Sequence, residues 1–225
     1  MIDWLIANPL LESFFKTALQ GAGMTVLTGG IGFLIGLVLG TLLMLMRENN
    51  QIFKTLVIVY VSAIRGTPLL IQLMIVYFVL PKMLGITLSP VIAGILALSF
   101  NTAAYISEIL RGAYTSVPNG QKMAGAALGM RPYQLWLYVL LPQVFMRSIP
   151  PLTNELTILL KASSLLSVIA VSELATVARN VTLETNMPLQ IFLIAAASYF
   201  LILFCVSSVS RLIESKVQRL LPNAR

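Results

Sequence analysis

Charged, histidine and cysteine side chains are scarce in this 225-residue sequence. It contains no histidine, one cysteine, and only 10% Asp, Glu, Lys and Arg. The lack of histidine excludes imidazole metal ligands, histidine-based triads and histidine proton relays. A single cysteine excludes an intrachain disulfide, so we expect Cys205 to be a small apolar packing residue. No lysine follows a glycine, which excludes a G-x-x-x-x-G-K-[ST] phosphate loop.

The acidic residues are also scattered, with no two adjacent in the sequence. Without paired acids, histidine or a reactive thiol environment, the chain lacks the constellation that a membrane-embedded enzyme needs. The sequence therefore predicts no catalytic residues, no metal site and no bound cofactor.

Apolar residues, in contrast, make up 58% of the chain, and the mean hydropathy is +0.90. A chain of this composition has too little polar surface to cover a soluble domain. Crossing about 30 Å of hydrocarbon takes about 20 helical residues, so long charge-free stretches indicate membrane spans. The sequence therefore predicts an all-α, polytopic membrane protein, with residues 1–225 forming one domain.

We predict five transmembrane helices, over residues of about 17–46, 55–80, 85–110, 149–171 and 187–211, with a cytoplasmic loop over about 112–148. The second span is interrupted at Arg65-Gly66-Thr67-Pro68, because proline removes a backbone donor and glycine loosens the helix. The run from Pro132 to Met146 is too short to span and has prolines near both ends. It predicts an interfacial helix that Pro142 terminates.

The orientation follows from the basic residues outside the spans, since short cytoplasmic loops are enriched in Lys and Arg. Ten lie on one side and three on the other: Arg47, Lys54, Arg111, Lys122, Arg131, Arg147, Arg211, Lys216, Arg219 and Arg225 against Lys16, Lys82 and Arg179. This places the C-terminus in the cytoplasm and the N-terminus outside. Membrane orientation thus explains most of the net charge of +7, and no nucleic-acid partner is needed.

The first span has two further features. Residues 1–15 have the pattern of an amphipathic lead-in, and Asp3 and Glu12 argue against a cleaved signal peptide, so we expect the span to be retained. Gly32, Gly36 and Gly40 recur at every fourth position, which strips side chains from one helix face. Such a face lets another helix approach closely, and we expect packing within this chain.

A polar-edged segment, GQKMAGAALGMRPYQLWLYVLLPQ, covers residues 120–143. Its alanines and glycines predict a helix with almost no side-chain volume, able to enter a groove on another protein. The small size of these side chains alone leaves a second interpretation open, in which the segment is a re-entrant or interfacial helix without a partner.

This segment resembles the EAA loop of ABC importer permeases, whose pattern is E-A-A, three residues, G, nine residues, I, any residue, L-P. Ala124, Gly129 and Leu141-Pro142 match at the family spacing. Met123 replaces the glutamate, Gly125 the second alanine and Val139 the isoleucine. Because the family's glutamate helps to fix the loop electrostatically, its loss suggests pairing with a different, acid-bearing permease.

Other stretches resemble the polar amino acid branch of these permeases. They are Arg65-Gly66-Thr67-Pro68-Leu69-Leu70, residues 101–108 with Arg111-Gly112, Pro118-Asn119-Gly120-Gln121, residues 150–155, and Leu160-Lys161-Ala162-Ser163-Ser164-Leu165. The family commonly has an acid where Ala162 stands, so a salt bridge at that position is not expected.

The resemblance implies a type I (MetI-like) permease architecture in the bacterial cytoplasmic (inner) membrane. Two permease subunits, like or unlike, would form a translocation path through the membrane lipids. A dimer of ATPase subunits, which binds the ATP and Mg, would dock on the cytoplasmic loops. An extracytoplasmic binding protein would deliver the amino acid. Binding of ATP to the ATPase and docking of the loaded binding protein would then drive alternating access.

The expected ATPase-coupling residues all lie in the EAA-like loop, and the lever within it is residues 124–131. They are Gly120, Gln121, Met123, Ala124, Gly125, Ala127, Leu128, Gly129, Met130, Arg131, Leu141 and Pro142. Gly129 would allow close backbone approach, and Arg131 would meet an acidic rim on the ATPase.

Charged and polar side chains within spans are costly in lipid and must face protein, water or an opposite charge. The candidates for the substrate pathway are Arg65, Asn101, Tyr105, Asn154 and Glu155. Glu108 and Arg111 are three residues apart and are predicted to form a structural pair. Arg65 has a second interpretation beside ligand contact, which is to stabilise the break in its span. Lys161, six residues from Glu155, needs a partner of its own.

A secondary transporter or channel subunit without an ATPase is the alternative function, although it would not need a small-residue docking helix. The sequence does not choose among cystine, glutamine, glutamate, histidine, arginine and opines as substrate. It also leaves homodimer and heterodimer open.

Overall fold

The computed structural model describes residues 9–220, and all secondary structure in that range is helical. The elements are α2 (Pro9–Asn49), α3 (Gln51–Arg65), α4 (Leu69–Met74), the π-helical η1 (Ile75–Val79), α5 (Leu80–Leu84), α6 (Pro90–Thr115), α7 (Asn119–Ala127), α8 (Pro132–Gln134), the π-helical η2 (Leu135–Leu140), α9 (Leu141–Ala162), the 3₁₀-helical η3 (Ser163–Ile169), α10 (Leu174–Thr185) and α11 (Pro188–Leu220). The predicted lead-in over residues 1–15 lies entirely outside the residues whose side chains are described.

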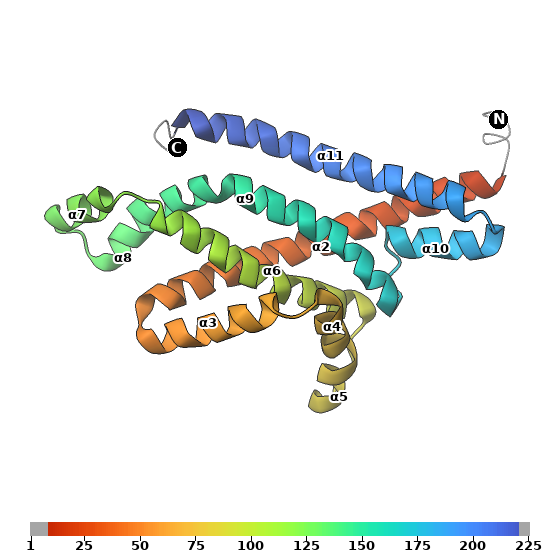
Figure 1. Cartoon of the computed structure of the whole chain (residues 1–225), viewed down its shortest axis with the longest axis horizontal. Coiled ribbons are helices and arrows are strands. Elements are labelled where there is room, and N and C mark those ends of the chain that lie inside the picture. Colours follow the sequence, from red (N-terminus) through yellow and green to blue (C-terminus); the bar gives the residue numbers. More distant parts are fainter. Residues whose placement is uncertain (1–8, 221–225) are drawn as a thin grey trace.

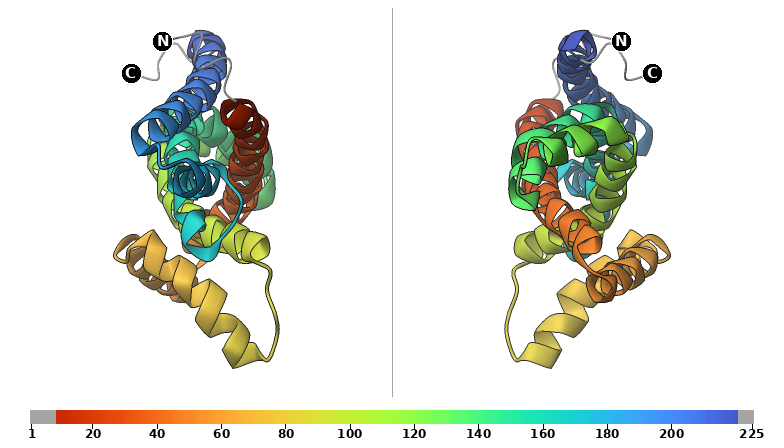
Figure 2. Two further views of the ribbon diagram at one scale, coloured as in Figure 1. Left: turned by 90° about the vertical axis from the view of Figure 1, so that its right-hand side faces the viewer. Right: turned by 90° about the vertical axis from the view of Figure 1, so that its left-hand side faces the viewer.

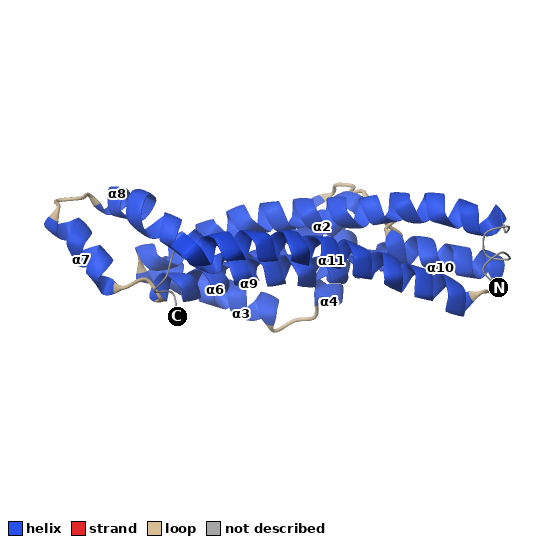
Figure 3. Ribbon diagram, turned by 90° about the horizontal axis from the view of Figure 1, so that it is seen from above, coloured by secondary structure: helices blue, strands red, loops and turns tan. Residues whose placement is uncertain are grey.

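Four long helices form the body of the molecule. α2, α6, α9 and α11 run alongside one another, with α2 packed along α6 and α9 packed against both α6 and α11 (Figures 1 and 3). The short helices α7 and α8 project from one end of this bundle, and the end of α11 lies toward the same side. α10 covers part of the opposite end, where it contacts α2 and α11.

The spans agree with the sequence prediction in number. Four described helices are long and apolar enough to cross a membrane, and the bent pair formed by residues 51–65 and 69–84 makes a fifth when it counts as one span. The helix axis bends by 104° between the two halves of that pair, at the predicted Gly66-Thr67-Pro68 break. As a result α4, η1 and α5 form an arm that leaves the bundle (Figure 2).

Gln72, which the sequence analysis did not single out, holds this bend. Its Nε2 atom donates to the carbonyl oxygens of Ile64 at 2.7 Å and Thr67 at 3.1 Å, and lies 2.9 Å from Thr67 Oγ1. Asn101 Nδ2 of α6 donates to Gln72 Oε1 at 3.0 Å. Side-chain amides thus satisfy carbonyls that the broken helix leaves open, which a span needs where water is excluded.

The glycine stripe of α2 packs within the chain, as predicted. A Cβ atom on Gly36 would lie 2.9 Å from Thr102 Cγ2, and one on Gly40 would lie 2.8 Å from Ile106 Cβ. The backbones of α2 and α6 therefore approach too closely for side chains on this face.

The prediction that Pro142 ends an interfacial helix is wrong. One helical segment runs from Pro132 to Ile169, through η2 and α9, as a single candidate span. The π-helical segment explains this, because the Leu141 N–H bonds to the Trp136 carbonyl five residues back and Pro142 then falls in the first turn of α9. Proline is tolerated in a first turn, where its missing N–H would have no helical partner.

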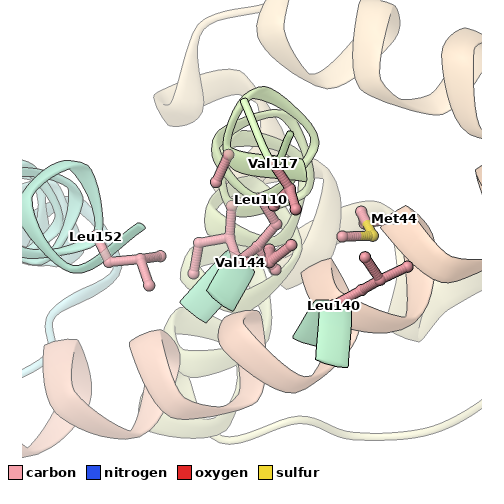
Figure 4. Close-up of a cluster of buried hydrophobic side chains, with 8 residues drawn as sticks. Met44, Leu110, Val117, Leu140, Val144 and Leu152 are labelled. Atoms are coloured by element: carbon pink, nitrogen blue, oxygen red, sulfur yellow. The ribbon is translucent and has the colours of Figure 1, made fainter. Parts of the chain in front are cut away.

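A compact apolar cluster anchors this long helix to its neighbours near the α7 end. Met44 of α2, Leu110 of α6 and Val117 meet Leu140 and Val144 from the η2–α9 segment (Figure 4). All five side chains are buried. The helices α7 and α8 are therefore attached to the bundle at a packed apolar core.

The segment between the last two spans forms helix α10, and Glu173 caps it. The fully buried carboxylate accepts hydrogen bonds from the N–H groups of Ala175 and Thr176, from Thr176 Oγ1, and from Tyr199 Oη of α11 at 2.8 Å. The neighbouring Leu174 N–H donates to Thr25 Oγ1 of α2. This network, which the sequence analysis missed, connects α10 to both flanking helices.

Candidate functional site

The EAA-like loop forms a helical hairpin, but its first helix is shorter than predicted. α7 ends at Ala127, and Gly129 adopts a left-handed backbone with φ of 72°. The Met130 N–H bonds to the Gly125 carbonyl, and the Gly129 N–H bonds to that of Ala126. This is the hydrogen-bond pattern of a Schellman helix end, in which glycine is favoured because a Cβ is strained at positive φ. The expectation that helical turns continue up to the break at Pro132 is therefore wrong, and the lever predicted over residues 124–131 stays a prediction for a short helix and the turn that follows it.

The two faces of α7 differ in exposure. Gly125 is buried against η2, where a Cβ atom would lie 2.5 Å from Leu135 Cδ1. Met130 is half-buried on the same side. The other expected coupling residues of the hairpin are exposed: Gly120, Gln121, Met123, Ala124, Ala127, Leu128, Gly129 and Arg131. Within this set, Met123 of α7 and Leu128, the residue that follows α7, expose 71% and 81% of their surface, so two large apolar side chains face outward here.

The residues at the far end of the EAA-like pattern lie away from α7. Arg131 begins the second helix, where its backbone N–H donates to Gln134 Oε1 at 2.8 Å. Leu141 and Pro142 lie in the first turn of α9, one half-buried and the other exposed. The pattern therefore covers both the projecting hairpin and its attachment to the bundle.

An aromatic pair lies where α7 meets the bundle. Lys122 Nζ of α7 donates to Tyr114 Oη at 2.9 Å and lies 4.0 Å from the centre of that ring. Tyr114, in the last turn of α6, stacks on Trp136 of η2 with ring centroids 4.9 Å apart. The sequence analysis assigned no contact to Lys122.

Glu108 and Arg111 form the predicted pair, with Glu108 Oε2 2.7 Å from Arg111 Nη2. Arg47, at the end of α2, forms a second ion pair with Glu108 Oε1. Because one carboxylate binds guanidinium groups from two helices, it links the C-terminal end of α2 to α6. The contribution of Arg47 could not be predicted, since 61 residues separate it from Glu108.

Of the three predicted pathway residues on α3 and α6, two lie in contact with each other. The Arg65 guanidinium lies over the Tyr105 ring, 5.3 Å from its centre, so this residue is held at the end of α3 by a cation–π contact. Arg65 also lines a cavity of about 210 Å³ together with Arg47, Ser62, Glu108 and the aliphatic side chains of Ile58 and Val61. Asn101 is instead buried, and its amide is engaged with Gln72.

Glu155, Asn154 and Lys161 lie on α9 with different surroundings. Glu155 is only 7% exposed, and among the described residues no salt bridge reaches its carboxylate. Asn154 and Lys161 are exposed. Of these three side chains Glu155 is therefore the buried one, in a span where an ionised carboxylate needs a partner.

Comparison with known proteins places this geometry in a family. The model of the family described as "Binding-protein-dependent transport system inner membrane component" matches residues 3–219. The chain belongs to this family. It is therefore a multi-pass permease of the inner-membrane type, as the sequence analysis predicted from the EAA-like loop.

Relatives of this inner membrane component are similar over almost their whole length. The L-cystine transport system permease protein TcyB of Bacillus subtilis is 38% identical over 210 residues, covering 92% of this chain and 89% of the relative. The arginine transport system permease protein ArtQ of the same organism is 35% identical over 201 residues, covering 89% and 92%. The glutamine transport system permease protein GlnP of Escherichia coli is 34% identical over 218 residues, covering 96% and 98%.

Solved structures agree with the inner membrane component's fold. The chain matches the structure of an amino acid ABC transporter crystallised with histidines, with a TM-score of 0.84, 30% identity, and coverage of 92% of this chain and 96% of that one. The inward-facing MetNI methionine ABC transporter matches with a TM-score of 0.68 at 22% identity, which supports the fold alone. The expected MetI-like architecture is thereby confirmed.

Proposed function

We propose that this chain is the membrane-spanning permease subunit of an ATP-driven amino acid importer. In this proposal α7 docks on a separate ATPase subunit, which binds the ATP and Mg, and the spans open alternately to the two sides of the membrane. The observation that carries the proposal is a small-residue helix with an exposed apolar face, held by a packed core at the end of a membrane bundle. The amino acid permeases among the relatives support the substrate class.

The orientation is part of the proposal. The excess of basic residues lies on the α7 side of the spans, so α7 and the C-terminal end of α11 would face the cytoplasm. The ATPase is then reached by the outer face of α7, with Met123 and Leu128 as apolar anchors and Arg131 at the rim.

Transport in this scheme needs two conformations of nearly equal free energy. ATP binding to the docked subunits and arrival of the loaded external receptor would each favour one conformation through different contacts. A second permease subunit would complete the path, and Met123 in place of the family's glutamate favours an unlike, acid-bearing partner.

We infer that Glu155 and Arg65 bind the two charged ends of the amino acid. An amino acid zwitterion carries an ammonium and a carboxylate group, so its recognition requires one acidic and one basic partner in a narrow path. Glu155 supplies a buried acid that forms no salt bridge among the described residues, and Arg65 supplies a cation at the end of α3. In this proposal the substrate lies between these two side chains, beside Tyr105, whose ring the Arg65 guanidinium covers.

Replacing Leu128 by Asp tests the docking step. Leu128 is 81% exposed, so the change removes no packing within this chain but places a charge on the apolar face of α7. We expect the ATPase subunit to be lost from the detergent-purified complex and uptake to fall with it. Gly129→Asp is a less specific test, because Gly129 has a positive φ and the side chain would strain the helix end.

Leu183→Asp is the matched control, since Leu183 is 74% exposed on α10 at the other end of the bundle. It should leave the ATPase bound. If the Leu128 variant retained its ATPase, Leu128 would not belong to the docking surface. If uptake by the wild type persisted without any ATPase and depended on an ion gradient, the importer proposal would be wrong and the secondary transporter alternative would stand.

Glu155→Gln tests the pathway. The variant keeps the shape and removes the charge, so the ammonium group of the substrate loses a charge-assisted hydrogen bond. We expect the amino acid concentration for half-maximal uptake to rise about tenfold or more. The measurement is uptake of radiolabelled L-cystine, L-glutamine and L-arginine into proteoliposomes containing the whole complex.

Glu184→Gln, an exposed acid on α10, provides the comparison and should not change uptake. Unchanged kinetics of the Glu155 variant with every substrate that the wild type carries would remove Glu155 from the path while leaving the docking proposal intact.

A further inference from the structure

Lys122 is on the inward face of α7, apart from the residues that we assign to ATPase docking. Its ammonium group contacts one partner, Tyr114, both through the hydroxyl oxygen at 2.9 Å and over the ring at 4.0 Å from the centroid. Because Tyr114 also stacks on Trp136, the cation ties α7 to α6 and to η2 at one point. Outside this point, α7 is attached through the packing of Gly125 on Leu135 and through its two connecting loops.

Tyr114 begins a row of side chains along α6. Arg111, Glu108 and Tyr105 follow it at intervals of three residues, which places neighbouring members next to each other on the helix surface. Arg111 binds Glu108, Glu108 binds Arg47 of α2, and the ring of Tyr105 lies under the guanidinium of Arg65. The row therefore extends from the docking helix to the end of α3, where the second span bends.

We propose that Lys122 is a positioning residue that transmits displacement of α7 to α6 by way of Tyr114. This inference rests on the proposed function, because it needs an ATPase to move α7. The contact is suited to the task, since a cation held by both the hydroxyl and the ring cannot slide along α6 without losing one interaction. The apolar contact of Gly125 with Leu135 has no such directionality.

The test replaces Lys122 by Met in the complete complex of permease, ATPase and binding protein in proteoliposomes. Methionine keeps an extended side chain but has no charge and no donor. We expect the ATPase to stay bound and basal ATP hydrolysis to stay within about twofold of wild type, while the amount of amino acid taken up per ATP falls by about fivefold or more. Radiolabelled L-cystine, L-glutamine or L-arginine serves as the probe, whichever the wild-type complex carries.

Two variants separate transmission from general damage. Lys122→Arg restores a cation and a donor and should recover more than half of the lost uptake per ATP. Lys54→Met removes an exposed lysine of α3 and should leave the ratio unchanged. A purely structural role of Lys122 would lower hydrolysis and uptake together, and their ratio would not move.

Two results would overturn the inference. The first is a wild-type ratio of uptake to hydrolysis in the Lys122→Met complex, and the second is loss of the ATPase from it, which would make Lys122 a docking residue. Either result leaves the proposed function standing. If the wild-type complex itself took up substrate without an ATPase, the proposed function would fail instead.

Discussion

Glu173→Ala is expected to destabilise the isolated permease by about 2–5 kcal/mol. The substitution removes the N-cap acceptor of two backbone N–H groups, which costs about 1–2 kcal/mol, and leaves the Tyr199 hydroxyl without its acceptor in a buried site, at about 1–3 kcal/mol. Folded proteins are stable by only about 5–15 kcal/mol, so the loss would be a large fraction of the total. The measurement is loss of helical circular dichroism on titration with SDS in mixed micelles.

Two further variants define the cause of this loss. Glu184→Ala removes an exposed acid from the same helix and is expected to change the free energy of unfolding by no more than about 0.5 kcal/mol. Glu173→Gln retains one oxygen acceptor for the N-cap and should lie between the two. If Glu173→Ala unfolded at the same SDS fraction as Glu184→Ala, the buried network would contribute nothing to stability.

Gly40→Ala is expected to destabilise the permease by about 1–3 kcal/mol, the usual range for an overpacked core. The added methyl group would lie 2.8 Å from two Ile106 atoms and 2.9 Å from the Ala103 carbonyl oxygen. A side chain can rotate away, but a backbone oxygen can move only if α2 and α6 separate. The same SDS titration measures the effect.

Gly30→Ala is the matched control within the same helix. Nothing lies within 4 Å of a Cβ atom at Gly30, so the change only improves helix propensity and is expected to stabilise by up to about 1 kcal/mol. The two glycine substitutions should therefore have opposite signs. A stabilising Gly40→Ala would mean that α2 and α6 are not in close contact in the micelle.

The sequence predicted features that depend on one element and its immediate neighbours. The glycines at every fourth position predicted close packing, and α6 lies against them. The Gly66-Thr67-Pro68 break predicted the bend of the second span. The pairing of Glu108 with Arg111 followed from their spacing on one helix. Each of these predictions needs only the geometry of a single helix.

Features that depend on residues far apart in the chain were missed or misread. Asn101 was singled out because it is polar within a span, and its pathway role stays a prediction, whereas its hydrogen bond with Gln72, 29 residues away, was missed. Glu173 was not singled out, although an acid one residue before a helix is a recognisable N-cap signal. That signal was available, whereas the contact with Tyr199 of α11 was not.

The misjudged helix ends have local causes. Proline usually ends a helix, and the π-helical segment that lets the chain continue through Pro142 has no clear sequence pattern. The end of α7 was readable in principle, because glycine is enriched just after a helix C-terminus and Gly129 occupies that position. Interpreting Gly129 only as a residue for close approach obscured this second role.

The π-helical segment over Leu135–Leu140 also controls the direction in which the docking helix points. It accommodates one residue more than an ordinary α-helix would, and each residue of an α-helix corresponds to about 100° of rotation. Loss of a single residue there would remove the geometry that accommodates Pro142 and would turn the α7 hairpin by about that angle relative to α9. The number of residues in this stretch therefore sets which way the exposed side of α7 points relative to the spans.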